Sequence, residues 1–213
     1  MRIRSSVHAG MIVVCAATVA GAAAPLSAQA WDSPSFFSPR PGEDIGLYII
    51  DAEGPGDLGF AGIWRQEGNI NLGVRAGLAG GDHFSVGAEF YGPLDVLGPQ
   101  SPVLLSWIVG AGATFNDVTW LRIPLGASIG MDIPTSSSIR ILPYIHPRVA
   151  FDLFAFDTPD GEETETELNV DLDLGADIGL GQQFVLRVGA TIGDLDAIGV
   201  GVAYKMGRRL VVR

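Results

Sequence analysis

The residue types of a hydrolytic site occur close together in one part of the sequence. His83, Ser85 and Glu89 lie near one another, and His146 follows later. A serine nucleophile needs a histidine within hydrogen-bond distance, and that histidine needs a carboxylate to orient it. Two residues that are two apart on a strand share a face but lie about 6 to 7 Å apart. We therefore predict no catalytic residue and no enzymatic activity, and we expect His146 to pack in a polar interior.

Three aspartates have the residue type of a calcium site without its spacing. Asp171, Asp173 and Asp177 lack the glycine and the ligand pattern of an EF-hand loop. On a strand, separations of two and four place all three on one face. Arg148 and Arg187, on the preceding and following strands, are the expected partners, because buried charges must pair. We predict a ladder of ion pairs, and neither a metal nor a cofactor.

A third candidate is the acidic segment 157–167. Its carboxylates are Asp157, Asp160, Glu162, Glu163, Glu165 and Glu167. Runs of like charge are usually solvated, so a solvated surface loop is the favoured interpretation. Binding of divalent cations by this loop is the alternative.

The elements that position these residues are strands, because apolar residues recur at every second position. Along 69–78 apolar side chains run from Ile70 to Leu78, with polar residues or glycine between them. Short links between segments predict antiparallel hairpins, and an even number of such strands closes into a barrel without edges. The predicted fold is all-β, a closed antiparallel up-and-down transmembrane barrel of about ten strands. Eight is the alternative, because the first two segments are the weakest. The ten segments are 44–51, 57–66, 69–78, 83–91, 103–115, 118–131, 138–154, 166–180, 183–193 and 196–206.

The first thirty residues have the pattern of a secretory signal. Arg2 and Arg4 precede a small-residue apolar stretch at 11–24, and Ala28-Gln29-Ala30 fits a cleavage site. Cleavage there removes the sole cysteine, Cys15. We therefore predict a cleaved signal at 1–30, a periplasmic leader at 31–43, a barrel at 44–206 and a tail at 207–213. The longest later apolar run, 103–115, is shorter than the roughly 18 residues that a membrane-spanning helix needs.

Composition indicates which face of the barrel meets lipid. Apolar residues make up 47% of the chain, charged residues only 17%, and 29 residues are glycine. The glycines fall mainly on the face opposite the aliphatic residues, where a soluble protein would carry lysine and glutamate. That face also carries charges of both signs, which can pair across a lumen. The aliphatic face is therefore predicted to point outward. The net charge of −11 argues against binding of nucleic acid.

Two sets of residues follow from this assignment. The predicted lumen charge network consists of Arg75, Glu89, Arg122, Arg140, Arg148, Asp152, Asp171, Asp173, Asp177 and Arg187. The predicted aromatic girdles, one at each membrane interface, consist of Trp64, Phe84, Phe90, Phe115, Phe151, Phe184 and Tyr204.

Two short motifs resemble a known family. The stretches Arg122-Ile-Pro-Leu-Gly-Ala-Ser-Ile-Gly130 and Pro143-Tyr-Ile-His-Pro-Arg-Val-Ala-Phe-Asp152 are similar to the paired late strands of small bacterial outer-membrane β-barrels of the OmpA/OmpX-like superfamily. That family most often has eight strands and usually ends on an aromatic residue, whereas this chain continues past Tyr204 to Arg213. The resemblance implies a bacterial outer-membrane location.

A barrel of this kind has few roles open to it. We expect an integral outer-membrane barrel with a structural or surface-interaction role, and we expect it to be a monomer. The alternatives are a narrow passive pore for ions or small solutes, a lipid-modifying envelope enzyme, and a soluble periplasmic lipocalin-like binder. The expected partners are outer-membrane lipid and lipopolysaccharide, with divalent cations at 157–167 as the alternative named above.

Overall fold

The computed structural model describes residues 31–52, 58–79, 83–98, 101–115, 118–135, 139–158, 161–193 and 196–206. The predicted signal at 1–30 and tail at 207–213 lie outside these residues. The described chain is built from strands joined by short connections. Over the same residues, no helix is long and apolar enough to cross a membrane.

The strands follow one another along the chain with bounds close to those expected. They are β1 (Asp44–Ala52), β2 (Leu58–Gln66), β3 (Asn71–Ala79), β4 (His83–Pro93), β5 (Val103–Phe115), β6 (Val118–Met131), β7 (Ile133–Pro134), β8 (Ile139–Thr158), β9 (Gly161–Leu180), β10 (Phe184–Ile192) and β11 (Ala197–Lys205). The two-residue β7 pairs with β8 just beyond the end of β6, so it extends β6 past Asp132.

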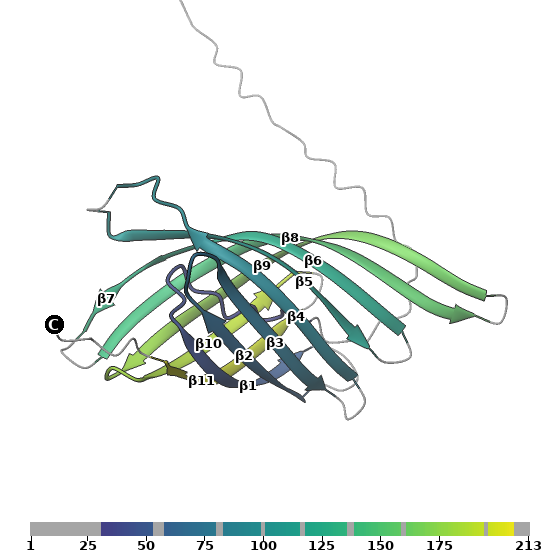
Figure 1. Ribbon diagram of the computed structural model, residues 1–213, viewed down its shortest axis with the longest axis horizontal. Helices are drawn as coiled ribbons and strands as arrows, with labels where there is room; N and C mark the ends of the chain where they lie inside the picture. The colour runs from purple at the N-terminus through teal and green to yellow at the C-terminus, as the bar shows by residue number, and fades with distance from the viewer. Residues whose placement is uncertain are drawn as a thin grey trace, which may run out of the picture.

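The described strands close into a ten-stranded antiparallel barrel, with β7 as the extension of β6 (Figure 1). Each of the other strands pairs with its neighbours in sequence. The sheet closes because β1 pairs with β11, with Ile45 opposite Tyr204. The prediction of a closed up-and-down barrel of about ten strands is confirmed.

The hairpin formed by β8 and β9 is longer than predicted. Both strands have 20 residues, and their pairing continues to Thr158 opposite Gly161. Figure 1 shows this hairpin running well past its neighbours. The expectation of a loop at 157–167 was therefore wrong for most of that segment. Thr164 and Thr166 alternate with glutamates, and threonine favours strands. The pairing of β8 with β9 therefore continues into the acidic part of the segment.

The two faces of each strand differ sharply in exposure. In β1, Leu47 and Ile49 are 76% and 47% exposed, whereas Tyr48 and Ile50 between them are 2% and 1% exposed. The same alternation continues in β11, where Val200 and Val202 point outward. Aliphatic side chains thus cover the outside of the wall, as predicted. Most buried arginines and aspartates of the strands lie on the inside.

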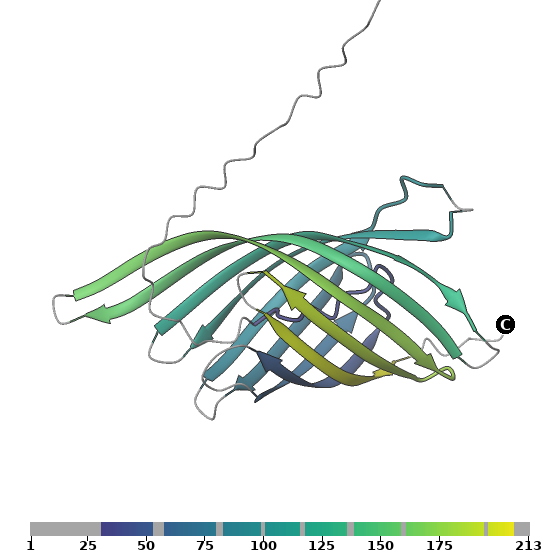
Figure 2. The same cartoon turned by 180° about the vertical axis from the view of Figure 1, so that it is seen from behind.

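The barrel encloses the segment that precedes β1. Every residue from Trp31 to Pro39 is buried, and Arg40 is the first exposed one. Figure 2 shows this stretch as a purple coil between the strands. We call residues 31–39 the plug. The sequence analysis treated 31–43 as a leader ahead of the barrel and gave it no part in the lumen, which the structure corrects.

Candidate functional site

The plug runs lengthwise through the bore. Its contacts with β6 advance together with the sequence: the Trp31 indole nitrogen donates to the carbonyl of Arg122 at 3.3 Å, and Ser128 donates its hydroxyl to the carbonyl of Phe37 at 2.8 Å. Pro39 then lies against Gly130 near the end of that strand. The plug therefore fills the lumen along its axis, with Trp31 innermost and Arg40 at the mouth.

Trp31 sits in a recess made by glycines of β4 and β5. A Cβ added at Gly112 would come within 2.6 Å of the indole ring, and one added at Gly110 within 3.0 Å. Such distances are shorter than van der Waals contact, so the ring needs these positions to lack side chains. Gly87 faces the same ring. The sequence analysis assigned these glycines to the inner face of the wall, and the structure shows that they accommodate the Trp31 ring.

Asp32 joins the plug to two arginines of the wall. Its carboxylate lies 3.0 Å from the Arg122 guanidinium and also pairs with Arg148. Burial raises the pKa of the Asp32 carboxyl, but the positive charges of Arg148 and Arg122 outweigh burial and hold that pKa below its ordinary value. Arg148 also donates to the Ser33 hydroxyl at 2.6 Å. The plug carries a charge that the wall is built to neutralise.

Ser35, His146 and Asp173 form a buried cluster that has the residue types of a triad. The Ser35 hydroxyl lies 2.8 Å and the Asp173 carboxylate 3.0 Å from the same ring nitrogen, Nδ1 of His146. A catalytic histidine uses one nitrogen for the nucleophile and the other for the carboxylate. Here Nε2 has no hydrogen-bond partner, and all three residues are buried. The arrangement holds the plug and does not activate the serine.

Two further arginines bind carbonyl oxygens of the plug. Arg65 donates to the carbonyls of Phe36 and Ser35 at 3.1 and 3.2 Å, and Arg75 donates to that of Pro34 at 2.7 Å. These guanidinium groups also lie over the rings of Phe37 and Phe36. The plug is not paired with any of the described strands. Arginine side chains of the wall therefore supply hydrogen bonds to its main-chain carbonyls.

The aromatic rings of the plug pack on opposite sides of the bore. Phe36 contacts Tyr48 of β1, with ring centroids 4.4 Å apart, and a Cβ at Gly199 of β11 would lie 2.6 Å from it. Phe37 packs against Tyr91 of β4 with centroids 5.4 Å apart. The φ angle of Phe36 is +48°, a left-handed conformation that is rare outside glycine. The plug is thus seated through its side chains at a cost in backbone strain.

Other ion pairs join strands of the wall that are neighbours or lie two positions apart in the barrel. Arg122 donates to Asp152 at 2.9 Å and pairs with Asp171. Arg187 lies 2.6 Å from Asp44 and 3.2 Å from Asp177, which in turn accepts a hydrogen bond from Ser38 at 2.8 Å.

Nine of the ten predicted network residues line the lumen and are buried, and Arg140 does not. Those nine are Arg75, Glu89, Arg122, Arg148, Asp152, Asp171, Asp173, Asp177 and Arg187. The side chain of Arg140 is 64% exposed and pairs with Asp132. Its position at the very start of β8, near the mouth, leaves it in solvent. Arg140 shares the inward face of β8 with Leu142 and Tyr144, but it is exposed at the mouth, so its inclusion in the lumen charge network is corrected.

The predicted aromatic residues point outward. Six of them are 43–47% exposed, and Trp64 is half-buried: the six are Phe84, Phe90, Phe115, Phe151, Phe184 and Tyr204. Phe84 stacks on Phe115 of the next strand with centroids 6.4 Å apart, and Phe184 meets Tyr204 edge-on at 5.6 Å. Their grouping into two membrane girdles stays a prediction.

The other sequence candidates take separate places. Glu89 pairs with Arg65 at 2.8 Å, and Ser85 lies against Gly77 of β3. The hydroxyl that contacts His146 is that of Ser35 in the plug, and not that of Ser85. Over 163–167 the residues are exposed, and the side chains of 157–162 lie outside those described. Across the described ranges, no group of three or more His, Cys, Asp or Glu side chains is placed to hold a metal ion.

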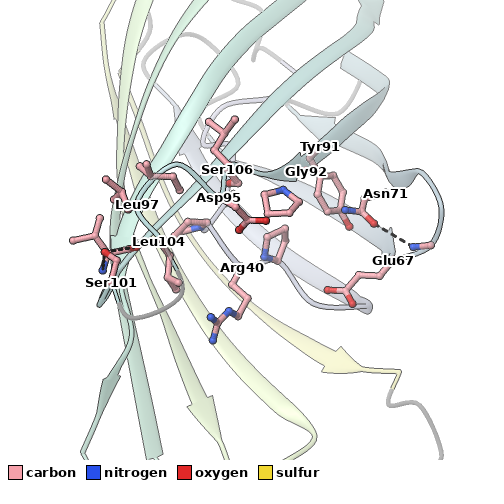
Figure 3. Close-up of a pocket in the computed structure, with 18 residues that line it drawn as sticks. Arg40, Glu67, Asn71, Tyr91, Gly92, Asp95, Leu97, Ser101, Leu104 and Ser106 are labelled. Atoms are coloured by element: carbon pink, nitrogen blue, oxygen red, sulfur yellow. Dashed lines mark hydrogen bonds between the residues drawn. The ribbon is translucent and has the colours of Figure 1, made fainter.

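A pocket of about 480 Å³ opens at the mouth, where the chain leaves the plug. Arg40, Tyr91 and Asp95 are among its lining residues, and in Figure 3 the Arg40 side chain extends away from the other two. The hydroxyl of Ser106 is buried at its inner wall without a hydrogen-bond partner. By contrast, the cavity beside Trp31 and Asp32 has about 10 Å³, room for about one water molecule. The bore is open at the mouth and closed at the plug.

The sequence analysis missed the whole plug. It also left out Asp44, which stands on an inward position of β1, pairs with Arg187 and could have been assigned from alternation. The plug gave a weaker signal. Residues 31–38, Trp-Asp-Ser-Pro-Ser-Phe-Phe-Ser, are aromatic and polar but have no strand period. The many inward glycines also left more space than the predicted charges could fill.

Comparison with known proteins gives matches to structures only. No family model and no curated protein matches the chain. The solved structure "KdgM porin" aligns at 8% identity with a TM-score of 0.44, covering 77% of this chain and 99% of that one. The N-terminal β-barrel domain of Pseudomonas aeruginosa OprF aligns at 10% identity with a TM-score of 0.39, covering 78% and 98%. Ail, the attachment invasion locus protein of Yersinia pestis, aligns at 12% identity with a TM-score of 0.34, covering 78% and 99%.

Proposed function

We propose that this chain is an integral bacterial outer-membrane β-barrel whose bore is closed by its own N-terminal segment. Its role in this proposal is structural or a surface interaction, without catalysis. The observation that carries the proposal is the plug. Nine consecutive buried residues occupy the lumen and are bound by arginines of four different strands, β2, β3, β6 and β8. A barrel filled in this way offers no open passage for solutes.

The outer face supports the membrane part of the proposal. A soluble protein rarely exposes a contiguous apolar patch larger than a few hundred Å². Here apolar side chains are exposed on neighbouring strands all around the wall, as Leu47, Phe60 and Leu78 illustrate on β1, β2 and β3. Lipid is the surrounding that makes such a surface stable.

The long β8–β9 hairpin is the element we propose for surface interaction. With periplasmic termini it extends on the cell-surface side, and residues 163–168 are exposed along it. Lipopolysaccharide is its proposed partner, with divalent cations bridging the lipid phosphates to the exposed carboxylates. Binding to lipopolysaccharide vesicles in the presence of Ca²⁺ should then weaken when Glu163, Glu165 and Glu167 are changed together to glutamine.

Three measurements test the proposed function, the first on fractionated cells and the other two on the purified mature protein. We expect recovery in the outer-membrane fraction, a heat-dependent shift in gel migration, and no stepwise conductance in planar lipid bilayers. Recovery in the soluble periplasm would contradict the membrane assignment. Frequent stepwise conductance of the unmodified protein would favour the passive pore instead.

A further inference from the structure

We infer that the plug is a tethered, removable ligand of the barrel, and that the bore beneath it conducts small ions when the plug withdraws. This inference rests on the proposed function, because it takes the barrel to span a membrane. It assigns to the lumen a binding site for an extended peptide. The peptide has an aromatic residue first, a carboxylate second, and two aromatic residues at the sixth and seventh positions.

The barrel wall does not depend on the plug for its backbone hydrogen bonds. Every pairing recorded for the described strands joins one strand to another, from Asp44 to Lys205. Side chains of the wall hold the plug, as in the hydrogen bond from the Arg75 guanidinium to the main-chain carbonyl of Pro34. Its departure therefore leaves the closed sheet intact, and water can hydrate the polar wall groups that it leaves.

The plug also carries strain that withdrawal relieves. Phe36 has its φ angle at +48°, a left-handed conformation that is unfavourable for a residue with a side chain. Arg65, through the Phe36 carbonyl, and Tyr48, through the ring, hold it there. Removal of these wall contacts frees Phe36 to return to an ordinary backbone conformation.

The path for withdrawal leads to the mouth. Cleavage of the predicted signal makes Trp31 the first residue, so the innermost end of the plug is a free end. The chain then leaves the bore without a loop having to pass through it. The pocket of about 480 Å³ around Arg40 lies at the point where the plug emerges and gives the tether room to move.

The wall that the plug uncovers carries nearly balanced charge. Among the described residues, the buried charged side chains of the wall are five arginines and six carboxylates: Arg65, Arg75, Arg122, Arg148 and Arg187, and Asp44, Glu89, Asp152, Asp171, Asp173 and Asp177. Glycine recesses on two sides of the bore are emptied at the same time. A polar bore with nearly equal charges of both signs suits small ions, with little preference between cations and anions.

The test compares an unseated plug with a matched control in the mature full-length chain. Asp32→Ala, Phe36→Ala and Phe37→Ala together remove the charge and both rings that anchor the plug. The control changes an aspartate and two apolar residues that lie side by side on the outer face, away from the mouth. Its substitutions are Asp51→Ala, Leu58→Ala and Ile198→Ala. Single-channel currents are recorded in planar bilayers at equal protein load, after the gel shift has shown that each protein is folded.

We expect stepwise conductance from the unseated variant at a frequency at least about tenfold above that of the wild type and of the control. A synthetic peptide of residues 31–41 should suppress these currents when supplied at millimolar concentration, which matches the effective concentration of a short tether. The same peptide with Asp32→Arg should not suppress them, because it places a positive charge against Arg122 and Arg148.

A folded, membrane-inserted unseated variant without conductance would overturn the inference and leave the proposed function standing. Conductance that the peptide does not affect would overturn the peptide site. If the triple variant does not fold, a chain lacking 31–39 is examined in the same way. Failure of that chain to fold also contradicts the inference, since an independent barrel is one of its premises.

Discussion

The outer and inner faces of the barrel wall are made by the same strands but completed by different partners. Outside, aliphatic side chains of neighbouring strands adjoin one another, as Ile49, Val200 and Val188 do across β1, β11 and β10. Inside, charges and glycines meet the plug, with Asp32 between Arg122 and Arg148. In our proposal the complement of the outer face is lipid, whereas that of the inner face is a segment of the chain itself.

This difference teaches that the two faces tolerate change in different ways. The outer face needs a chemical property, apolarity, and any side chain with that property satisfies it. The inner face needs particular groups at particular places, because each buried charge has its own partners and each recess its own occupant. Matched substitutions on the two faces should therefore differ in their effects.

The largest difference is expected between two arginines. Arg122→Ala leaves the carboxylates of Asp32, Asp152 and Asp171 buried with fewer partners, which should lower the free energy of unfolding by about 3–5 kcal/mol. Arg140→Ala removes an exposed pair with Asp132 and should cost less than about 1 kcal/mol. Urea unfolding of the protein in lipid vesicles measures both. Equal losses would show that the lumen pairs are no more important than surface pairs.

A somewhat smaller effect is expected for a charge placed on the outer face. Val200→Arg puts a guanidinium between Ile49 and Val188 on the apolar side of the wall, and should cost about 2–4 kcal/mol in vesicles. Ile70→Arg, in the exposed turn between β2 and β3, is the control and should cost little. The same vesicle assay applies. A neutral Val200→Arg would contradict the assignment of this face to lipid.

The smallest of the three effects concerns a single methyl group. Gly112→Ala directs a Cβ to within 2.6 Å of the Trp31 ring and 2.7 Å of the Gly87 backbone, and such overpacking should cost about 1–3 kcal/mol. Gly62→Ala, on the outer face, meets only Leu47 at 3.9 Å and should be close to neutral. If both substitutions proved neutral, Trp31 would not occupy the recess.

The strands could be predicted because their signal is local. Alternation along a few residues shows both that a strand exists and which of its faces is apolar, so the bounds of β5 and β6 were predicted as observed. Charges on inward positions, such as Asp152 and Arg187, follow from the same alternation. Arg140 was misplaced because alternation gives the face of a residue but not its depth in the bore.

The plug could not be predicted because its signal is not local. Residues 31–38 have no strand periodicity, and the side chain of Ser35 meets His146, 111 residues away in the sequence. Their meeting depends on closure of the whole barrel. The inward glycines indicated that other groups fill the lumen. The sequence alone did not show that these groups include a segment of the chain besides the charged side chains of the wall.

Thiol accessibility is the most direct test of the claim that the N-terminal segment fills the lumen. Cys15 is the sole cysteine of the sequence and lies in the predicted signal, so in a chain that begins at Trp31 one engineered cysteine reports one site. Ser35→Cys is buried in the bore, and Gln182→Cys lies exposed in the turn between β9 and β10. We predict that a water-soluble maleimide labels the folded Ser35→Cys protein at least roughly a hundredfold more slowly than the Gln182→Cys protein, and both equally fast after heat unfolding. Equal rates in the folded proteins would contradict the account.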